Sequence, residues 1–152
     1  MKVLNIVVRD NELRQMYEEA VLKHNDQNEY ANSGFDLFLP EDYSLDPGAV
    51  KISYEVKAAM VDASGTPSAY CIYSRSSIYK MPLRMTNGVG VIDRGYRGNL
   101  CSVFDVSEHV ELKRGQRLVQ ICAPDLSPFK VNFVESLEQT SRGEGGFGST
   151  GV

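Results

Sequence analysis

The segment VKISYEVKAAM, residues 50–60, alternates apolar and mostly polar side chains along its length. The apolar side chains occupy every second position and are Val50, Ile52, Tyr54, Val56, Ala58 and Met60. Successive side chains of a β-strand point to opposite faces of the sheet, so a period of two predicts a strand with one buried face. We therefore expect a half-buried strand over residues 50–60.

Short apolar segments on both sides of residues 50–60 predict further strands. Upstream they are Val3–Val8 and Ser33–Leu39, the second of which ends at Pro40. Downstream they are Tyr70–Tyr73, Leu83–Thr86, Val89–Ile92, Leu100–Val106, Val110–Leu112, Arg117–Ala123 and Val131–Val134. Turns are expected at Asp46-Pro47-Gly48, Ala63–Ser68 and Lys113-Arg114-Gly115. The pair Asn87-Gly88 between two strands predicts a tight hairpin.

A single segment has helical periodicity. Asp10 is a typical N-cap residue, and the apolar positions that follow at helical spacing are Leu13, Met16, Tyr17, Ala20 and Val21. Glu19 and Lys23 lie one turn apart and can form an ion pair. We expect this helix to serve in packing, followed by a polar loop over Asn25–Asn32.

Many short strands, one helix and no alternation of strands with helices indicate an all-β fold, either a sandwich or a barrel. The chain has 152 residues, which is the size of one domain with a substantial core. We expect that domain over residues 1–140, followed by a C-terminal arm over residues 141–152.

Composition excludes several classes of function. The net charge of −4 argues against non-specific nucleic-acid binding, which needs a basic face. No segment has the apolar length of a membrane span, and residues 1–12 lack the features of a signal peptide, so we expect a soluble intracellular protein.

The cysteines and histidines do not indicate a metal site or a catalytic triad. Cys71, Cys101 and Cys122 are widely spaced, and clustered zinc ligands are absent from the sequence. We expect all three to be reduced residues on strands, because free cysteine behaves as a small hydrophobic residue. His24 and His109 are isolated, with no arrangement of Ser, Cys or carboxylate around them that predicts a triad.

The segment SRGEGGFGSTG, residues 141–151, cannot form a core and has the composition of a phosphate-binding lid. Glycines let several backbone N–H groups approach one anion. Arg142 offers a planar fork for phosphate oxygens, Ser149 and Thr150 offer hydroxyl donors, and Phe147 offers a ring on which a base can stack. The alternative is a glycine-rich disordered tail.

Other segments carry weaker indications of the same chemistry. Arg75, Ser76 and Ser77 follow a predicted strand and can bind phosphate oxygens, and Gln120 can donate to a phosphate from a strand. Asp93 follows a buried strand and can orient or deprotonate a water molecule, while Tyr96 can pack on a sugar. Each is also compatible with an ordinary exposed loop or strand residue.

Five segments in order resemble the five motifs of the trimeric dUTP pyrophosphatases, the dUTPases. They are SGFDLFLP, SRSSIYK, NGVGVIDRGYRGNL, GQRLVQI and RGEGGFGSTG, and they extend from Ser33 to Gly151. The third and fifth are the most specific. The resemblance implies a distorted jelly-roll β-barrel assembled as a homotrimer, with each active site shared between subunits and the arm closing over a neighbouring site.

The resemblance also implies a reaction, the hydrolysis of dUTP to dUMP and pyrophosphate, and a role for each matching residue. Asp93 matches the aspartate that orients water for attack on the α-phosphorus. Asp36 matches a carboxylate associated with the water shell of Mg²⁺, which the triphosphate itself would mostly hold. The positions that match base and sugar contacts are Asn87, Gly90, Val91, Ile92, Tyr96 and Phe147. The positions that match phosphate contacts are Arg75, Ser76, Ser77, Gln120, Arg142, Gly146, Ser149 and Thr150.

This sequence departs from the common family pattern in several places. Ser77 stands where glycine usually follows the Arg-Ser pair, and Ser74 and Tyr79 replace the more frequent proline and alanine. Gly95 makes the turn between Asp93 and Tyr96 more flexible. The helix over Asp10–Lys23 resembles an insertion before the first motif.

Two other functions compete with dUTP hydrolysis. A dCTP deaminase, or a bifunctional deaminase–dUTPase, shares the barrel and the trimer. Either enzyme needs a glutamate that activates water at C4 of the base, and the segment RGNLCSVFD after Tyr96 offers none. A non-catalytic nucleotide-binding regulator is expected to lack the water-orienting carboxylate or the arm, and both are present here.

Overall fold

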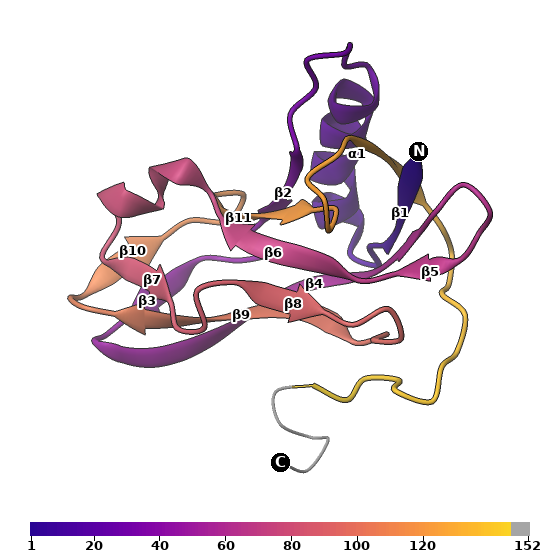
Figure 1. Cartoon of the computed structure of the whole chain (residues 1–152). Helices are drawn as coiled ribbons and strands as arrows, with labels where there is room; N and C mark the ends of the chain where they lie inside the picture. The colour runs from indigo at the N-terminus through magenta and orange to yellow at the C-terminus, as the bar shows by residue number, and fades with distance from the viewer. Residues whose placement is uncertain (147–152) are drawn as a thin grey trace.

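The computed structural model describes residues 1–146, and these form one β-rich unit with a single α-helix (Figure 1). The positions of Phe147, Ser149 and Thr150 lie outside the described residues. The elements are β1 (Lys2–Val7), α1 (Asn11–Asn25), β2 (Gly34–Phe38), β3 (Tyr43–Leu45), β4 (Gly48–Val61), β5 (Pro67–Ser68), β6 (Tyr70–Ser74), the 3-10 turn η1 (Ser76–Lys80), β7 (Leu83–Met85), β8 (Gly90–Ile92), β9 (Asn99–Val106), β10 (Val110–Leu112), β11 (Arg117–Cys122) and β12 (Phe129–Phe133).

The strands form two main sheets and a small two-stranded sheet. One sheet has the order β12-β1-β4-β9-β7, with β5 beside β4, and the other has the order β2-β11-β6-β8. Strands β10 and β3 pair separately. Over residues 1–146 the sheets remain open paths and do not close into a continuous ring, but the predicted all-β class is confirmed.

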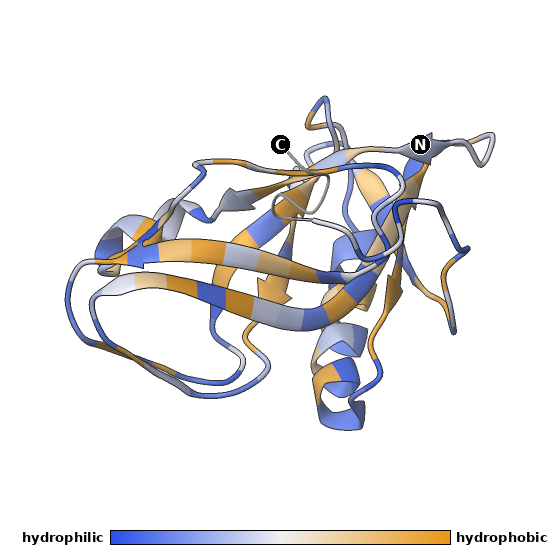
Figure 2. Ribbon diagram, turned by 90° about the horizontal axis from the view of Figure 1, so that it is seen from below, coloured by the Kyte–Doolittle hydropathy of each residue, from blue (hydrophilic) through white to orange (hydrophobic). Residues whose placement is uncertain are grey.

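Strand β4 confirms the alternating pattern that predicted it. Ile52, Tyr54, Val56 and Ala58 are at most 1% exposed, while the residues between them face outward or are only partly covered. Figure 2 shows the same alternation of hydrophobic and hydrophilic residues along the long strands. The register against β9 shifts between Ser53 and Lys57, which marks an irregularity that the sequence pattern did not predict.

The sequence predicted a hairpin in which the strands on either side of Asn87-Gly88 pair with each other, and this pairing is wrong. The turn exists, and Gly88 adopts a φ of 72°, which favours glycine. However, β7 pairs with β9 in one sheet, and β8 pairs with β6 in the other. The turn therefore carries the chain between two sheets, because each strand finds its hydrogen-bond partner elsewhere.

Helix α1 packs on its own chain. The Asp10 side chain caps it by accepting a hydrogen bond from the Leu13 N–H, 2.9 Å away. The Tyr17 hydroxyl accepts from the Phe38 N–H at 2.8 Å and ties the helix to β2. The Asn25 amide both donates to the Val131 carbonyl and accepts from the Val131 N–H, at 2.8 and 2.9 Å, which ties the helix to β12. These contacts fix the helix against both sheets.

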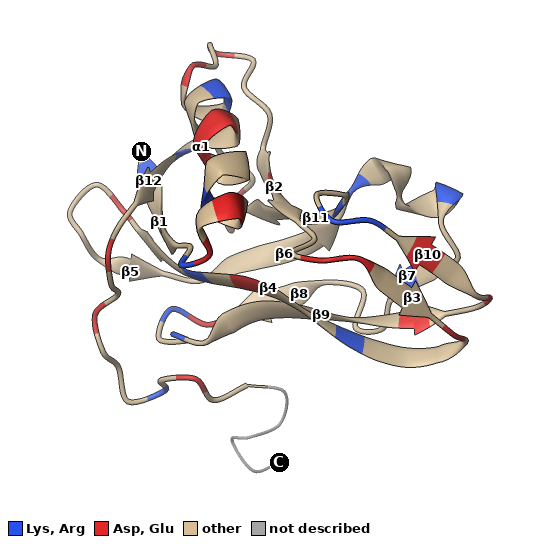
Figure 3. Ribbon diagram, turned by 180° about the vertical axis from the view of Figure 1, so that it is seen from behind, with Lys and Arg blue, Asp and Glu red and all other residues tan. Residues whose placement is uncertain are grey.

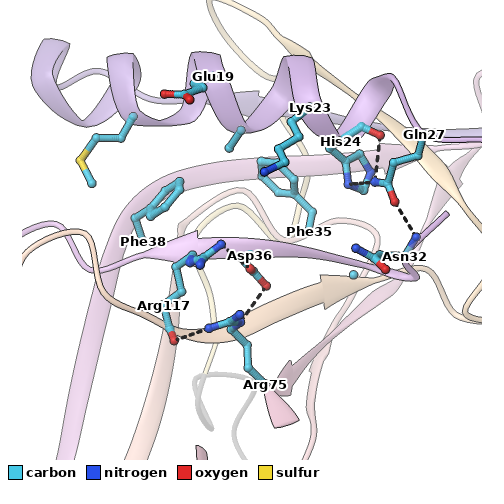
Figure 4. A pocket seen from close by; sticks show the side chains of 13 residues that line it. Glu19, Lys23, His24, Gln27, Asn32, Phe35, Asp36, Phe38, Arg75 and Arg117 are labelled. Atoms are coloured by element: carbon cyan, nitrogen blue, oxygen red, sulfur yellow. Dashed lines mark hydrogen bonds and ion pairs between the residues drawn. The ribbon is translucent and has the colours of Figure 1, made fainter. Parts of the chain in front are cut away.

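The predicted ion pair between Glu19 and Lys23 is not among the interactions of residues 1–146. On this helix the one-turn ion pair joins Arg14 to Glu18, with 3.6 Å between Nε and Oε1. The Arg14 guanidinium also lies 4.3 Å from the centre of the Phe133 ring. The Lys23 side chain extends from the helix toward the strands (Figure 4).

The three cysteines are free and lie on strands β6, β9 and β11, as predicted. Within residues 1–146, no helix combines the length and apolar character that crossing a bilayer requires. Figure 3 shows acidic and basic residues interspersed along the visible loops, helix and strands, without a face of one sign in that view.

We predict opposite pH effects for the two histidines. Burial lowers the pKa of His24, whose Nε2 lies 2.9 Å from the Phe129 carbonyl, so its neutral form stabilises the fold above its usual pKa of about 6.5. This contribution is lost as the pH falls through the lowered pKa. The difference in Tm between wild type and His24→Gln should therefore narrow from pH 7.5 to pH 5.

His109→Gln is the control. Hydrogen bonds to Asp46 and Glu111 raise the pKa of His109, so its contribution is full below about 6.5 and is lost as the pH rises through the raised value. The difference in Tm between wild type and His109→Gln should therefore widen as the pH falls. Parallel trends for the two variants would contradict this assignment.

Candidate active site

The first group of predicted site residues gathers on three adjacent strands. In the register of the sheet, Gln120 on β11 lies opposite Asp36 on β2 and Tyr73 on β6. Arg75 follows β6 directly, and its N–H donates to the Leu118 carbonyl at 3.0 Å. Sequence segments that are far apart therefore meet in the β2–β11–β6 half-site, which consists of Asp36, Arg75, Ser76 and Gln120.

Asp36 is the electrostatic centre of this half-site. Its Oδ1 lies 3.2 Å from Arg75 Nε, and its Oδ2 lies 3.2 Å from Arg117 Nη1. One carboxylate therefore faces two guanidinium groups, which leaves an excess of positive charge for an anion. Arg117 was not predicted as a site residue, although it begins β11, the strand that carries Gln120.

The half-site opens onto a cavity of about 600 Å³. Gly34, Asp36, Arg75, Ser76 and Gln120 all line it. Ser77 lies elsewhere, in the η1 turn, and lines a separate hollow with Gln116 and Leu118. The structure thus brings Ser76 to the cavity and turns Ser77 away from it.

Gly34 makes room for the Gln120 side chain. A Cβ at position 34 would lie 1.9 Å from Gln120 Oε1, which is far inside van der Waals contact. The Gln120 amide in turn donates to the Ser74 carbonyl at 3.3 Å. Glycine at position 34 therefore leaves the space in which the Gln120 side chain adopts its orientation toward β6.

The second group lies around the loop after β8. Asp93, Tyr96, Arg142 and Gly146 form the loop half-site. Arg142 Nη1 lies 2.6 Å from Asp93 Oδ2, and Arg142 Nε donates to the Gly145 carbonyl at 2.7 Å. The Tyr96 hydroxyl donates to the Asn99 carbonyl at 2.6 Å, and burial raises the pKa of Tyr96. A Cβ at Gly146 would sit 3.4 Å from the Tyr96 ring, so the arm passes close to that ring.

The start of the arm is attached to this loop of its own chain (Figure 1). Tyr96 and Gly143 form an isolated parallel bridge, and the Arg97 N–H donates to the Gly143 carbonyl at 2.5 Å. Thr140 Oγ1 donates to the Gly95 carbonyl. Arg97 is only 9% exposed and donates to the carbonyls of Arg94, Tyr96 and Glu138 at 2.8–3.1 Å. Its role was missed because nothing in the sequence identifies a buried arginine that binds carbonyls.

The two half-sites lie at opposite ends of β6. Tyr70 pairs with Ile92, immediately before Asp93, whereas Ser74 immediately precedes Arg75. The four residue steps from Tyr70 to Ser74 span about 13 Å. The cavity beside the β2–β11–β6 half-site has no lining residue from the loop half-site.

The predicted base-binding residues lie on an edge strand. Strand β8, which contains Gly90, Val91 and Ile92, is the last strand in its sheet, so one of its edges has no strand partner within residues 1–146. Val91 is 66% exposed. Asn87 lies in the exposed turn before this strand. Free backbone donors and acceptors on such an edge can bind the polar edge of a planar ligand.

Comparisons with known proteins identify the family of the chain. A family model described as dUTPase matches residues 22–151. The deoxyuridine 5'-triphosphate nucleotidohydrolase of Corynebacterium jeikeium (strain K411) is 34% identical over 128 residues, covering 80% of this chain and 81% of that relative. The enzyme of the same name from Mus musculus is 36% identical over 121 residues, covering 78% and 72%.

A solved structure, native EIAV dUTPase, has a similar fold. The TM-score is 0.50 with 24% sequence identity, and the match covers 64% of this chain and 78% of that chain. The chain belongs to the dUTPase family, and its fold is of the same jelly-roll type.

We predict that Gly34→Ala weakens nucleotide binding without unfolding the protein. The new methyl group should displace the end of the Gln120 side chain, and the affinity for a non-hydrolysable dUTP analogue should fall about tenfold. Gln120→Ala should show a similar loss, and the double variant should be no worse than either single variant, because both changes remove one interaction. Additive losses measured by calorimetry would show that Gly34 acts independently of Gln120.

Proposed function

We propose that this protein hydrolyses dUTP to dUMP and pyrophosphate. The observation that carries the proposal is the set of two half-sites in a chain of the dUTPase family, one with Asp93 and one with the arginine-flanked Asp36. The relatives described above bear the name of this activity. The chemistry of each half-site fits a different part of the nucleotide.

The base and the sugar of dUTP bind at the edge of β8 and at the loop that follows it. Asn87 and the backbone of Gly90, Val91 and Ile92 bind uracil, and a close fit excludes the methyl group of thymine. Cytosine is rejected because its reversed donor and acceptor pattern leaves buried groups unpaired. Tyr96 packs under the deoxyribose, and Phe147 stacks on the base.

The phosphates of dUTP bind to the β2–β11–β6 half-site and to the arm. Arg75, Ser76 and Gln120 contact the triphosphate, whereas Ser77 lines a separate hollow and is not part of this group. The arm adds Arg142, Gly146, Ser149 and Thr150. Arg142 is bonded to Asp93 in the present arrangement, so its transfer to the phosphates would accompany closure of the arm.

The residues present fit a magnesium ion held mainly by the substrate. Among residues 1–146, no cluster of three or more His, Cys, Asp or Glu side chains could enclose a metal. Asp36 is a single carboxylate at the edge of the phosphate cavity and would contact the water shell of Mg²⁺, because this ion usually keeps several waters and is bound mainly by substrate phosphates. When bound, Mg²⁺ neutralises charge on the triphosphate and on the pyrophosphate that leaves.

The residues of the chain then promote the reaction by positioning the attacking water and the phosphates. Asp93 accepts a hydrogen bond from a water molecule and directs it in line toward the α-phosphorus. Arg75, Gln120 and Arg142 stabilise the charge that develops on the phosphate oxygens. The bond from the α-phosphorus to the bridging oxygen breaks, and pyrophosphate leaves without a covalent enzyme intermediate.

The separation of the half-sites supports a homotrimer with shared active sites. Asp93 and Arg75 follow opposite ends of β6, and the cavity beside Arg75 includes no residue of the loop half-site. Assembly brings the loop half-site of one copy to the β2–β11–β6 half-site of another, as a closed ring of identical contacts allows.

The proposal is tested by measuring pyrophosphate release from dUTP, dCTP, dTTP and UTP in parallel with Mg²⁺ present. Release from dUTP alone is expected, because base and sugar contacts each exclude one class of analogue. Binding of dUTP without release would instead indicate a regulator. Release of ammonia from dCTP would indicate a deaminase.

We predict that Asp93→Asn retains dUTP binding and loses most turnover. The amide keeps the size of the side chain but removes the charge that orients water, so kcat should fall about a hundredfold or more. Asp42→Asn is the matched control, since Asp42 lies on an exposed loop and accepts from the Arg114 N–H, a bond that asparagine can keep. Full turnover by Asp93→Asn in a steady-state assay would overturn the assigned role.

We predict that a chain truncated before Arg142 remains folded but is nearly inactive. The buried hydrophobic core of the described chain ends at Val131, so the arm contributes no core side chain up to residue 146. Its loss removes Arg142 and the contact between Gly143 and the Asp93 loop, and kcat/KM should fall at least about a hundredfold. Circular dichroism and Tm serve as the folding control, and a large drop in Tm would count against the lid role.

A further inference from the structure

A second cavity adjoins the phosphate half-site and lies against helix α1 (Figure 4). Its volume is about 660 Å³. Lys23 and His24 line it from the helix, and Asp36, Arg75 and Arg117 line it from the strands. It shares Gly34, Asp36 and Arg75 with the phosphate cavity, so the two cavities are adjacent at these residues.

The strand side of this cavity carries more positive than negative charge. Both oxygens of Asp36 are engaged, one by Arg75 and one by Arg117, each at 3.2 Å. Arg75 Nη1 also donates to the Arg117 carbonyl at 3.2 Å, which holds the two arginines side by side. Two guanidinium groups around one carboxylate form a fixed fork of donors for phosphate oxygens.

Lys23 faces this group from across the cavity. Figure 4 shows its side chain extending from the helix toward the strands, whereas Glu19 stays beside the helix. Lys23 is exposed, and no ion pair of residues 1–146 involves it. An ammonium group on a flexible stem can approach an anion that enters between helix and strands.

His24 does not contribute a second cation. Its Nε2 lies 2.9 Å from the Phe129 carbonyl, which only accepts, so that nitrogen carries the hydrogen. Burial lowers the pKa of His24 and favours the neutral ring. Lys23 is therefore the cation that the helix adds to the cavity.

We propose that Lys23, together with Arg75 and Arg117, forms a subsite for the terminal phosphates of the nucleotide and for the pyrophosphate that leaves. This inference rests on the proposed dUTP hydrolysis. The helix is held by Tyr17 and Asn25 at β2 and β12, so the backbone of Lys23 has a fixed position. The family match begins at residue 22, so residues 11–21 of α1 precede it, whereas Lys23, Arg75 and Arg117 lie within it.

The test is calorimetric titration of inorganic pyrophosphate, with Mg²⁺, into wild type, Lys23→Met, Lys23→Arg and Lys113→Met. Lys113→Met is the control, because Lys113 is an exposed lysine in the turn before β11, 3.9 Å from Asp42. Lys23→Met should bind pyrophosphate about five to ten times more weakly, while Lys23→Arg and Lys113→Met should stay within about twofold of wild type. The affinity for dUMP should be unchanged in all four proteins, since dUMP lacks the terminal phosphates.

Product inhibition gives a second measurement of the same subsite. The inhibition constant of pyrophosphate against dUTP turnover should rise in Lys23→Met by the same factor as the dissociation constant. Equal pyrophosphate binding by wild type and Lys23→Met, or no pyrophosphate binding by wild type, would overturn the subsite. Binding that depends on Lys23 in a protein without dUTP turnover would support the subsite and refute the proposed function, so the two failures are distinguishable.

Discussion

The position of β11 between β2 and β6 is the constraint on which the site depends. Strand β11 buries Leu118, Val119 and Ile121 almost completely, so its register is fixed by the core. That register sets Gln120 opposite Asp36 and brings Arg75 beside both. A slip of one residue would turn Gln120 into the core and separate it from Asp36 and Arg75.

The pairing of β8 with β6 has the opposite consequence. It places Asp93 at the end of β6 that is remote from Arg75, so the proposed water-orienting carboxylate and the proposed phosphate-binding arginine of one chain are kept apart. The start of the arm stays with Asp93 through Gly143 and Arg142. One chain thus carries the two half-sites apart from each other, and the proposed assembly of several copies would bring them together.

The sequence predicted the individual strands and the helix well, but it predicted poorly which strands pair with each other. Alternation identified β4, and the Asp10 cap identified the start of α1, because both depend on neighbouring residues. The Asn87-Gly88 turn was correct, but the pairing of its strands was not, since strand partners are decided by contacts across the whole sheet. The motifs identified Asp36 and Arg75, but Arg117, Arg97 and the cavity at Lys23 depend on packing between distant segments that no local pattern records.

The most direct test of this account is to mix two inactivated variants, Asp93→Asn and Arg75→Ala, by refolding them together. Each variant has one intact half-site, so shared sites that combine the intact halves should regain activity. Random assembly would restore about a quarter of wild-type dUTP turnover. Turnover no greater than the sum of the separate variants would contradict the account, because it would mean that each chain completes its own site.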